Sequence, residues 1–117
     1  MSEQDYRAVY EHYRAGLRQL HRALPETMGA FAQLHRQATR DGVLSAKTKE
    51  LIALGIAIAA RCSGCIAFHV HDALRAGASA EEITETIGVA VLMGGGPAAM
   101  YGVEALRALE QLRTATP

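Results

Sequence analysis

The sequence predicts an all-α fold, a single-domain bundle of about six helices within residues 1–117. Apolar residues recur at intervals of three and four, Ser or Pro residues precede the apolar stretches, and Gly residues follow several of them. The composition suits close helix packing, because twenty-two residues are Ala and only 5% are aromatic. Each Ala buries little area, at roughly 25 cal/mol per Å². We therefore expect burial between subunits to supplement a thin core.

The first two helices are predicted from Gln4 to about Leu24 and from Pro25 to about Arg40. Pro25 suits the first position of a helix, where its missing N–H costs nothing. Asp41-Gly42 then predicts a turn. The first helix carries an apolar stripe whose three Tyr are expected to pack against the body or another subunit. The stripe consists of Tyr6, Tyr10, Tyr13, Leu17, Leu20 and Leu24.

Ser45 is predicted to be the N-cap of a third helix, from about Ala46 to Ala60. Its second half, Leu51 to Ala60, has no polar side chain, which is typical of a helix buried all round. A fourth helix is predicted over Cys65 to Arg75, with Gly77 closing its C-terminal end.

Ser79 and Glu82 have the spacing of a capping box and predict a fifth helix that runs to about Leu92. Gly94 to Gly96 and Pro97 end that helix, and a last helix is expected from about Ala98 to Arg113. The glycines lack the preceding strand and the Lys of nucleotide-binding motifs, so they predict a tight turn between helices.

The charge balance excludes several classes of partner. Twelve basic and twelve acidic residues give a formal net charge of zero, and the basic residues are scattered, which argues against nucleic acid or an anionic membrane as the main partner. The longest apolar run is half of the ~20 residues that span a bilayer, and the first residues are polar where a secretory signal needs an apolar stretch. We therefore expect a cytoplasmic protein whose two Cys are reduced at rest rather than structural.

Cys62, Cys65 and His69 can meet at one spot. At ~100° per residue these three positions fall within an arc of roughly 60° around a helix. Two thiols so spaced can close a short disulfide, the N-terminus of a helix stabilises a thiolate, and the imidazole can accept or return a proton. His71 lies on the opposite side of the helix from Cys62, so we exclude it from the site.

Glu50 is the last charged residue before the apolar run that begins at Leu51. A carboxylate at the edge of a buried helix is poorly solvated and is a candidate general base. The alternative is that Glu50 faces solvent in the first turn, where acidic residues favour the helix dipole.

The residue types favour redox chemistry over a metal or haem site. A closed structural zinc site needs four ligands, and Cys62, Cys65 and His69 supply three, with Glu50 as the only obvious fourth. Covalent haem attachment requires His directly after the second Cys, where Ile66 stands. Thioredoxin places its Cys pair after a strand, and none is predicted here. We therefore expect no cofactor and no metal.

The spacing resembles the active-site pattern of the alkylhydroperoxidase D-like branch of the carboxymuconolactone decarboxylase family. Eleven residues separate Glu50 from Cys62, two separate the cysteines, and three separate Cys65 from His69. The residues from Arg61 to Val70, Ala76-Gly77-Ala78 and Glu81-Glu82-Ile83 are also similar. The resemblance covers about Leu44 to Ala105, the motif-bearing core, whereas residues 1–40 match only as generic helices.

The resemblance implies an all-helical fold that assembles as homotrimers or hexamers, with antioxidant peroxidase and disulfide-reductase activity. It implies that Cys65 attacks the hydroperoxide and that Cys62 then closes a disulfide, which an external dithiol of the thioredoxin or lipoyl type reduces. Glu50 and His69 would form a proton relay, with Glu50 serving Cys62 and His69 serving Cys65. The start of a helix, by contrast, favours the thiolate at Cys62, so the order of attack stays open.

One departure from the pattern concerns the residues between the cysteines. The best-known peroxidase members carry a His there as a further relay group, whereas this chain has Ser63-Gly64. Two other functions stay open beside the peroxidase. One is a lactone decarboxylase like the member that gives the family its name, which does not depend on a Cys pair. The other is a non-catalytic redox or metal-binding subunit.

Overall fold

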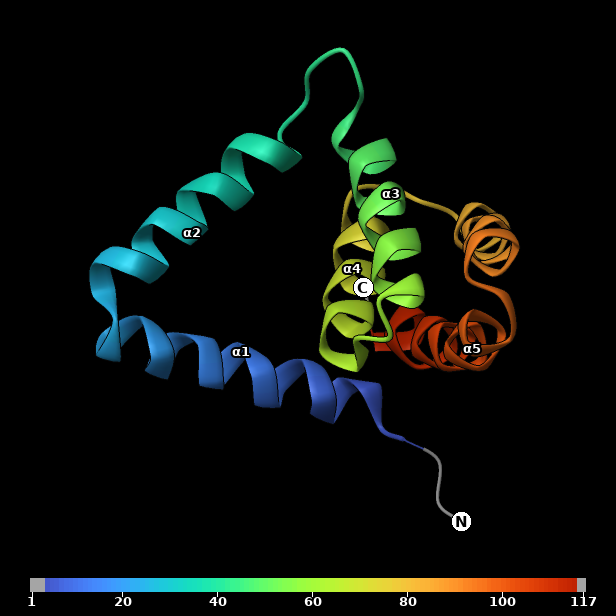
Figure 1. Cartoon of the computed structure of the whole chain (residues 1–117), viewed down its shortest axis with the longest axis horizontal. Helices are drawn as coiled ribbons and strands as arrows, with labels where there is room; N and C mark the ends of the chain where they lie inside the picture. Colours follow the sequence, from blue (N-terminus) through green and yellow to red (C-terminus); the bar gives the residue numbers. More distant parts are fainter. Residues whose placement is uncertain (1–3, 116–117) are drawn as a thin grey trace.

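The structure is a computed structural model that describes residues 4–115, and every regular element in that range is an α-helix. The all-α class is therefore confirmed. The elements in chain order are α1 (Tyr6–Ala23), α2 (Pro25–Thr39), α3 (Ala46–Ala59), α4 (Ser63–Arg75) and α5 (Ala80–Ala115) (Figure 1). The polar start of the sequence falls partly on residues 1–3, which, like residues 116–117, lie outside the described residues.

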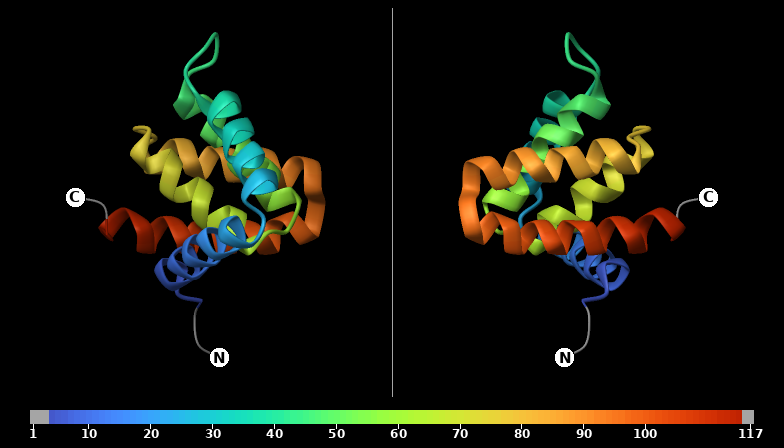
Figure 2. Two further views of the ribbon diagram at one scale, coloured as in Figure 1. Left: turned by 90° about the vertical axis from the view of Figure 1, so that its left-hand side faces the viewer. Right: turned by 90° about the vertical axis from the view of Figure 1, so that its right-hand side faces the viewer.

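The predicted count of about six helices becomes five because the last two are joined in α5. Only Gly95 departs from helical geometry inside α5, with φ 70° and ψ −150°. That left-handed φ favours Gly, because a side chain would clash with the backbone. Figure 2 shows the two halves of α5 side by side and running in opposite directions. The predicted turn at Gly94 to Gly96 is therefore present as a reversal at one residue.

The capping signals place the helix ends close to their predicted positions. Ser45 caps α3 by accepting from the N–H of Thr48, and Pro25 is the first residue of α2. Ser79 and Glu82 form the predicted capping box, at 2.9 and 3.1 Å. The N–H of Ser79 lowers the pKa of the Glu82 carboxyl, with help from Lys47 at 3.0 Å.

The core lies where α3 packs against α4 and α5. Leu54 and Ile58 of α3, Ile66 and Val70 of α4 and Ile83 of α5 are fully buried. Ala residues fill much of the remaining interior, which lets the helix axes approach closely. The residues of this kind are Ala57, Ala67, Ala73, Ala78, Ala90, Ala98, Ala105 and Ala108.

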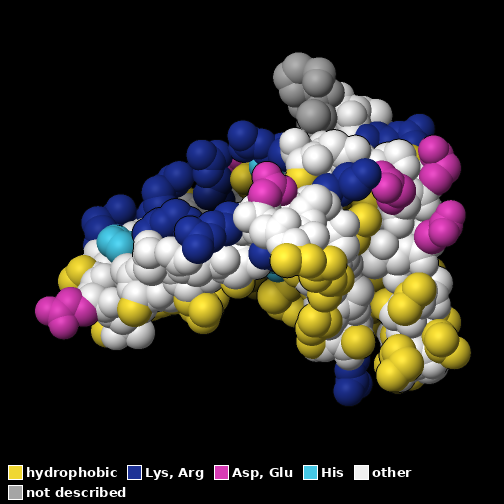
Figure 3. Space-filling view, turned by 90° about the horizontal axis from the view of Figure 1, so that it is seen from above, with side chains coloured by type: hydrophobic (Ala, Val, Ile, Leu, Met, Phe, Trp, Pro, Cys, Tyr) yellow, Lys and Arg dark blue, Asp and Glu magenta, His cyan; other side chains and the backbone are white. Residues whose placement is uncertain are grey.

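Helices α1 and α2 form an arm on one side of this core (Figure 1). Tyr6 anchors α1, since its N–H donates to Gln111 at 2.6 Å and its hydroxyl donates to Glu104, both on α5. Burial and the Glu104 carboxylate raise the pKa of the Tyr6 phenol. Helix α2 buries none of its residues. Basic side chains line the arm, and hydrophobic side chains gather at the opposite end (Figure 3).

The sequence predicts that the apolar half of α3 is buried on all faces, and the structure shows that this prediction is wrong. Leu54 and Ile58 are buried, but Ile52 and Ile56 on another face are 48% and 64% exposed. They line an apolar groove of about 420 Å³ between α3 and α5. The prediction fails because apolar residues on every face of a helix indicate only that these faces are buried in the working protein. They do not indicate whether the same chain or another molecule buries them.

Helix α5 is the one helix within residues 4–115 that is long and apolar enough, by length and composition, to cross a membrane. It does not run straight, because the reversal at Gly95 divides it into two segments that pack on α3 and α4. Its exposed apolar residues include Val89, Leu92 and Met93 beside the groove, which are 62 to 79% exposed. These residues and the exposed Ile52 and Ile56 of α3 are called the α3/α5 face below.

Candidate active site

Cys62 stands at the junction where α3 ends and α4 begins. Its N–H donates to the carbonyl of Ala57 at 3.1 Å, and the N–H of Arg61 donates to the carbonyl of Ile58 at 3.1 Å. These two bonds form a Schellman motif, in which Arg61 takes the left-handed position with φ 61°. The same residue Cys62 is the N-cap of α4. The end of α3 therefore fixes the backbone from which α4 and its thiols start.

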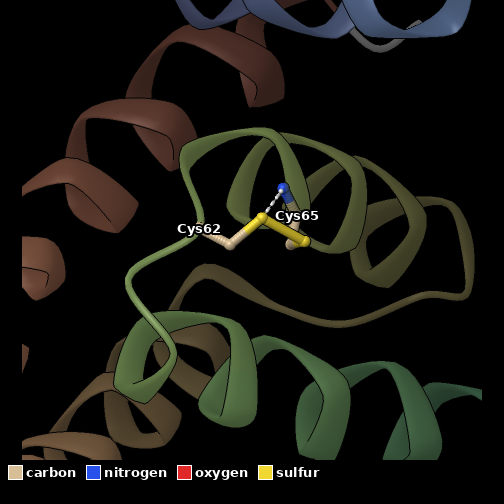
Figure 4. The surroundings of a disulfide bond; sticks show 2 residues. All are labelled: Cys62 and Cys65. Atoms are coloured by element: carbon tan, nitrogen blue, oxygen red, sulfur yellow. Dashed lines mark hydrogen bonds between the residues drawn. A yellow bond between two sulfur atoms is a disulfide. The ribbon is translucent and has the colours of Figure 1, made fainter.

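Cys62 and Cys65 are joined by a disulfide across the first turn of α4 (Figure 4). Their Cα atoms are 5.2 Å apart, within the range of disulfides. The sulfur of Cys62 also accepts from the N–H of Cys65 at 3.2 Å, in the place where a Ser or Asp oxygen usually caps a helix. Cys65 is exposed and Cys62 is half-buried. The pair thus combines backbone donors with access from solvent.

Glu50 and His69 form a hydrogen-bonded pair between α3 and α4. Nδ1 of His69 and Oε1 of Glu50 are 2.8 Å apart. The Glu50 side chain is 7% exposed and that of His69 is 20% exposed. The carboxylate accepts from Nδ1–H, which orients the ring and leaves Nε2 of a neutral imidazole as its basic nitrogen. Glu50 therefore does not face solvent, and of the two readings that the sequence leaves open, the structure favours the buried one.

The two pairs meet on α4. His69 follows Cys65 by four residues in this helix, so the two side chains lie on one face in adjacent turns. Glu50 reaches the same helix from α3 through its bond to His69. The contact that the structure gives Glu50 is thus with His69, while the resemblance assigns it to Cys62. Helical spacing thus places His69 on the same face as Cys65, and a hydrogen bond joins His69 to the buried Glu50.

His71 makes different contacts from His69. Its ring stacks on Tyr10 of α1, with centroids 4.2 Å apart, and its Nδ1 lies 2.9 Å from Oδ1 of Asp72. Tyr10 also packs against Phe68, at 4.8 Å between ring centroids. Burial first, and then the Asp72 charge, raise the pKa of Tyr10. Tyr10 and Tyr13 therefore pack against α4 and Tyr6 bonds to α5, so the three Tyr of α1 pack against the body, as the sequence predicts.

Two residues near the site are not predicted from the sequence. Asp72 follows Cys65 by seven residues and His69 by three, so helical spacing on α4 could have found it. His35 of α2 has an atom within 4.8 Å of Glu50 and Asp72, and no local pattern could have found it because it arrives from another helix.

The ring of Tyr13 covers the turn between the two cysteines. A Cβ atom built on Gly64 would lie 3.1 Å from Cδ2 and 3.2 Å from Cε2 of Tyr13. Such distances are tighter than ordinary van der Waals contact, so the backbone of α4 and the Tyr13 ring meet here only because residue 64 has no side chain. The Tyr13 ring therefore leaves room at position 64 for Gly and not for a larger residue.

Gly64→His is expected to lower the free energy of unfolding by about 1 kcal/mol, because the new Cβ pushes against the Tyr13 ring. In a Tyr13→Ala background the same change is expected to raise it by roughly 0.5 kcal/mol, because His is a better helix former than Gly. Denaturant unfolding of the four proteins in one redox state measures both values as a double-mutant cycle. Equal effects of Gly64→His in the two backgrounds would show that Tyr13 does not constrain residue 64.

Residues 25–108 match the sequence profile of the carboxymuconolactone decarboxylase family. The match includes α2, α3, α4 and most of α5, and therefore all four predicted site residues. An uncharacterized protein from Cupriavidus necator is 42% identical over 93 residues, which are 80% of this chain and 82% of the relative.

Two solved structures share the fold. A family protein from Legionella pneumophila, crystallised in an apo form, superposes with a TM-score of 0.89 and 42% sequence identity, covering 94% of this chain and 98% of its own. A family protein from Thermotoga maritima gives a TM-score of 0.72 and 32% identity, covering 85% of this chain and 91% of its own.

Proposed function

Because the chain belongs to the carboxymuconolactone decarboxylase family, we propose that it works as a thiol-dependent peroxidase and disulfide oxidoreductase of the alkylhydroperoxidase type. The observation that carries the proposal is the Cys62–Cys65 disulfide at the start of α4, one turn before a His that is bonded to a buried carboxylate. The relative from Thermotoga has been suggested to act in an antioxidative response, which agrees with this reading.

The first proposed step reduces the hydroperoxide. With the disulfide open, His69 takes the proton of Cys65 through Nε2, and Glu50 stabilises the resulting imidazolium through Nδ1–H. The Cys65 thiolate attacks the terminal oxygen of the hydroperoxide, so an S–O bond forms and the O–O bond breaks. The leaving alkoxide takes the proton back from His69. The products are an alcohol and a Cys65 sulfenic acid.

The second proposed step closes the disulfide. The Cys62 thiolate attacks the sulfur of the Cys65 sulfenic acid, an S–S bond forms, and hydroxide leaves and is protonated to water. An external dithiol of the thioredoxin or lipoyl type then gives up two electrons and two protons by thiol–disulfide exchange. The exposed position of Cys65 suits this exchange, because the incoming thiolate must reach one sulfur of the bond.

Several copies of the chain are proposed to assemble, as a trimer or hexamer, over the α3/α5 face. This face presents exposed Ile, Val, Leu and Met side chains at and beside the 420 Å³ groove, and contiguous apolar surface of this kind marks sites of association between proteins. A second copy of the chain would bury the exposed apolar side chains of α3. The proposed setting is the cytoplasm, where a reductant keeps returning Cys62 and Cys65 to thiols.

The reduced protein is expected to consume hydrogen peroxide or cumene hydroperoxide, losing two thiols for each peroxide before any reductant is added. Thiol titration after a stoichiometric pulse measures this ratio, and added dihydrolipoamide should make the reaction catalytic, with ping-pong kinetics.

Unchanged thiols after exposure to both peroxides, with no turnover with dihydrolipoamide or reduced thioredoxin, would refute the peroxidase. A lactone decarboxylase would instead keep its activity when both cysteines are replaced by Ser. A non-catalytic redox subunit would lose thiols to the peroxide but show no turnover with any dithiol.

A further inference from the structure

Three helices bring a His and two carboxylates together beside the Glu50–His69 pair. His35 of α2, Glu50 of α3 and Asp72 of α4 each offer a ligand atom, and these atoms all lie within 4.8 Å of one another. The residues are 15 and 22 positions apart in sequence, so only the packing of the arm against α3 and α4 makes the cluster.

The cluster has a buried end and an open end. Glu50 is 6% exposed, Asp72 is partly buried, and His35 is exposed. Two carboxylates near one another repel unless a positive charge lies between them. A cation that enters beside His35 would meet both carboxylates and neutralise them.

The geometry is close to that of an open metal site. Ligand atoms in a tetrahedral zinc site lie about 3.4 Å apart, given bonds of about 2.1 Å. The present separations reach 4.8 Å. Rotation of the exposed His35 ring could bring its nitrogen closer to the two carboxylates and shorten these distances. Open zinc sites use three protein ligands and a water molecule, which matches the number of groups here.

Both carboxylates are already oriented by imidazoles. His69 lies 2.8 Å from Oε1 of Glu50, and His71 lies 2.9 Å from Oδ1 of Asp72. Each carboxylate has a second oxygen that these bonds do not use. Hydrogen bonds of this kind fix the direction of ligating carboxylates in metal sites and are part of what sets their affinity.

We propose that His35, Glu50 and Asp72 bind one divalent transition-metal cation, with Zn²⁺ as the preferred type because imidazole and carboxylate together suit it. This site contains no sulfur and differs from the set of Cys62, Cys65, His69 and Glu50, which the sequence disfavours as a zinc site. Where the proposed peroxidase holds, the two sites share Glu50, whose second oxygen would hold the cation while Oε1 keeps its bond to His69.

The test uses the full chain with its disulfide closed, so that no thiol competes for the metal. Calorimetric titration with zinc sulfate is expected to show one Zn²⁺ per chain in the parent protein. His35→Gln and Asp72→Asn are expected to weaken binding at least tenfold, in line with the loss of a ligand. His21→Gln and Glu85→Gln, which change an exposed His and an exposed acidic residue outside the cluster, serve as matched controls and should bind as the parent does.

Cobalt gives a second readout that is independent of peroxide turnover. Co²⁺ bound to the oxidised protein is expected to show the visible bands of nitrogen and oxygen ligation without a sulfur charge-transfer band. The proposal fails if the oxidised protein shows no saturable binding, or if the control variants weaken binding as much as His35→Gln does. It also fails if zinc binds only after reduction, because the Cys pair would then be the ligand.

Discussion

Cys65→Ser is expected to abolish peroxide turnover, lowering kcat by at least about 10³-fold, because a serine hydroxyl is a far weaker nucleophile than a thiolate. Cys62→Ser is expected to lose catalytic turnover as well, but to keep one round of peroxide reduction. Dimedone separates the two roles, since it should label a sulfenic acid in Cys62→Ser and leave Cys65→Ser unlabelled. Intact-protein mass spectrometry after one equivalent of peroxide measures the adduct.

The control for these variants is the reduced parent protein, because the disulfide itself stabilises the fold. Closing so short a loop is worth about 2 kcal/mol in the chain-entropy estimate. Both Ser variants should therefore unfold at the denaturant concentration of the reduced parent. Labelling of Cys65→Ser but not of Cys62→Ser would reverse the order of attack and favour the thiolate at the N-cap of α4. Full turnover in either variant would contradict the disulfide mechanism.

Glu50→Gln is expected to lower kcat by about 10²-fold while the fold is kept. The Gln side chain has the same size and its amide oxygen can still accept from Nδ1–H of His69, but it carries no charge to stabilise an imidazolium. Removal of a buried charge should not weaken the core, because the carboxylate must be desolvated to sit there. Steady-state kinetics with hydrogen peroxide and a saturating dithiol measure the loss.

Glu85→Gln is the matched control, because Glu85 is an exposed acidic residue of α5 outside the site. It should leave kcat unchanged. A second readout follows the thiolate itself, whose ultraviolet absorbance near neutral pH should fall in Glu50→Gln and not in Glu85→Gln. A Glu50→Gln protein with parental kcat and parental thiolate absorbance would remove Glu50 from the relay and leave it a structural partner of His69.

The helix ends could be predicted because each is marked by a local signal. Pro25, Ser45, the Ser79–Glu82 capping box and Gly77 act on the backbone within one turn, so neighbouring residues suffice to recognise them. For α4 the sequence predicts a start at Cys65, two residues late, because Cys is a rare N-cap. The reversal inside α5 depends on one residue, Gly95, whose φ cannot be read from a run of three glycines.

The candidate site also contains some residues that local sequence patterns predict and others that they do not. Cys62, Cys65 and His69 lie on or next to one helix, so their spacing fixes their proximity, and Glu50 is found through the apolar run that follows it. The position of His35 within 4.8 Å of Glu50 and Asp72 depends on how the arm packs, which no local pattern determines. The same holds for Tyr13 over Gly64, because two helices meet there whose residues lie 51 positions apart.

The bonds that Tyr6 of α1 makes to α5 also affect the nascent chain during synthesis. Tyr6 bonds to Gln111, 105 residues later, so α1 gains this anchor only after the second half of α5 has been made. Tyr13, carried by the same helix, is held over Gly64 with the help of that anchor only from then on. At roughly 5–20 residues per second, Cys62 and Cys65 spend some seconds outside the ribosome without that cover. The two thiols are therefore open to solutes during synthesis, before the Tyr13 ring is held over the turn between them.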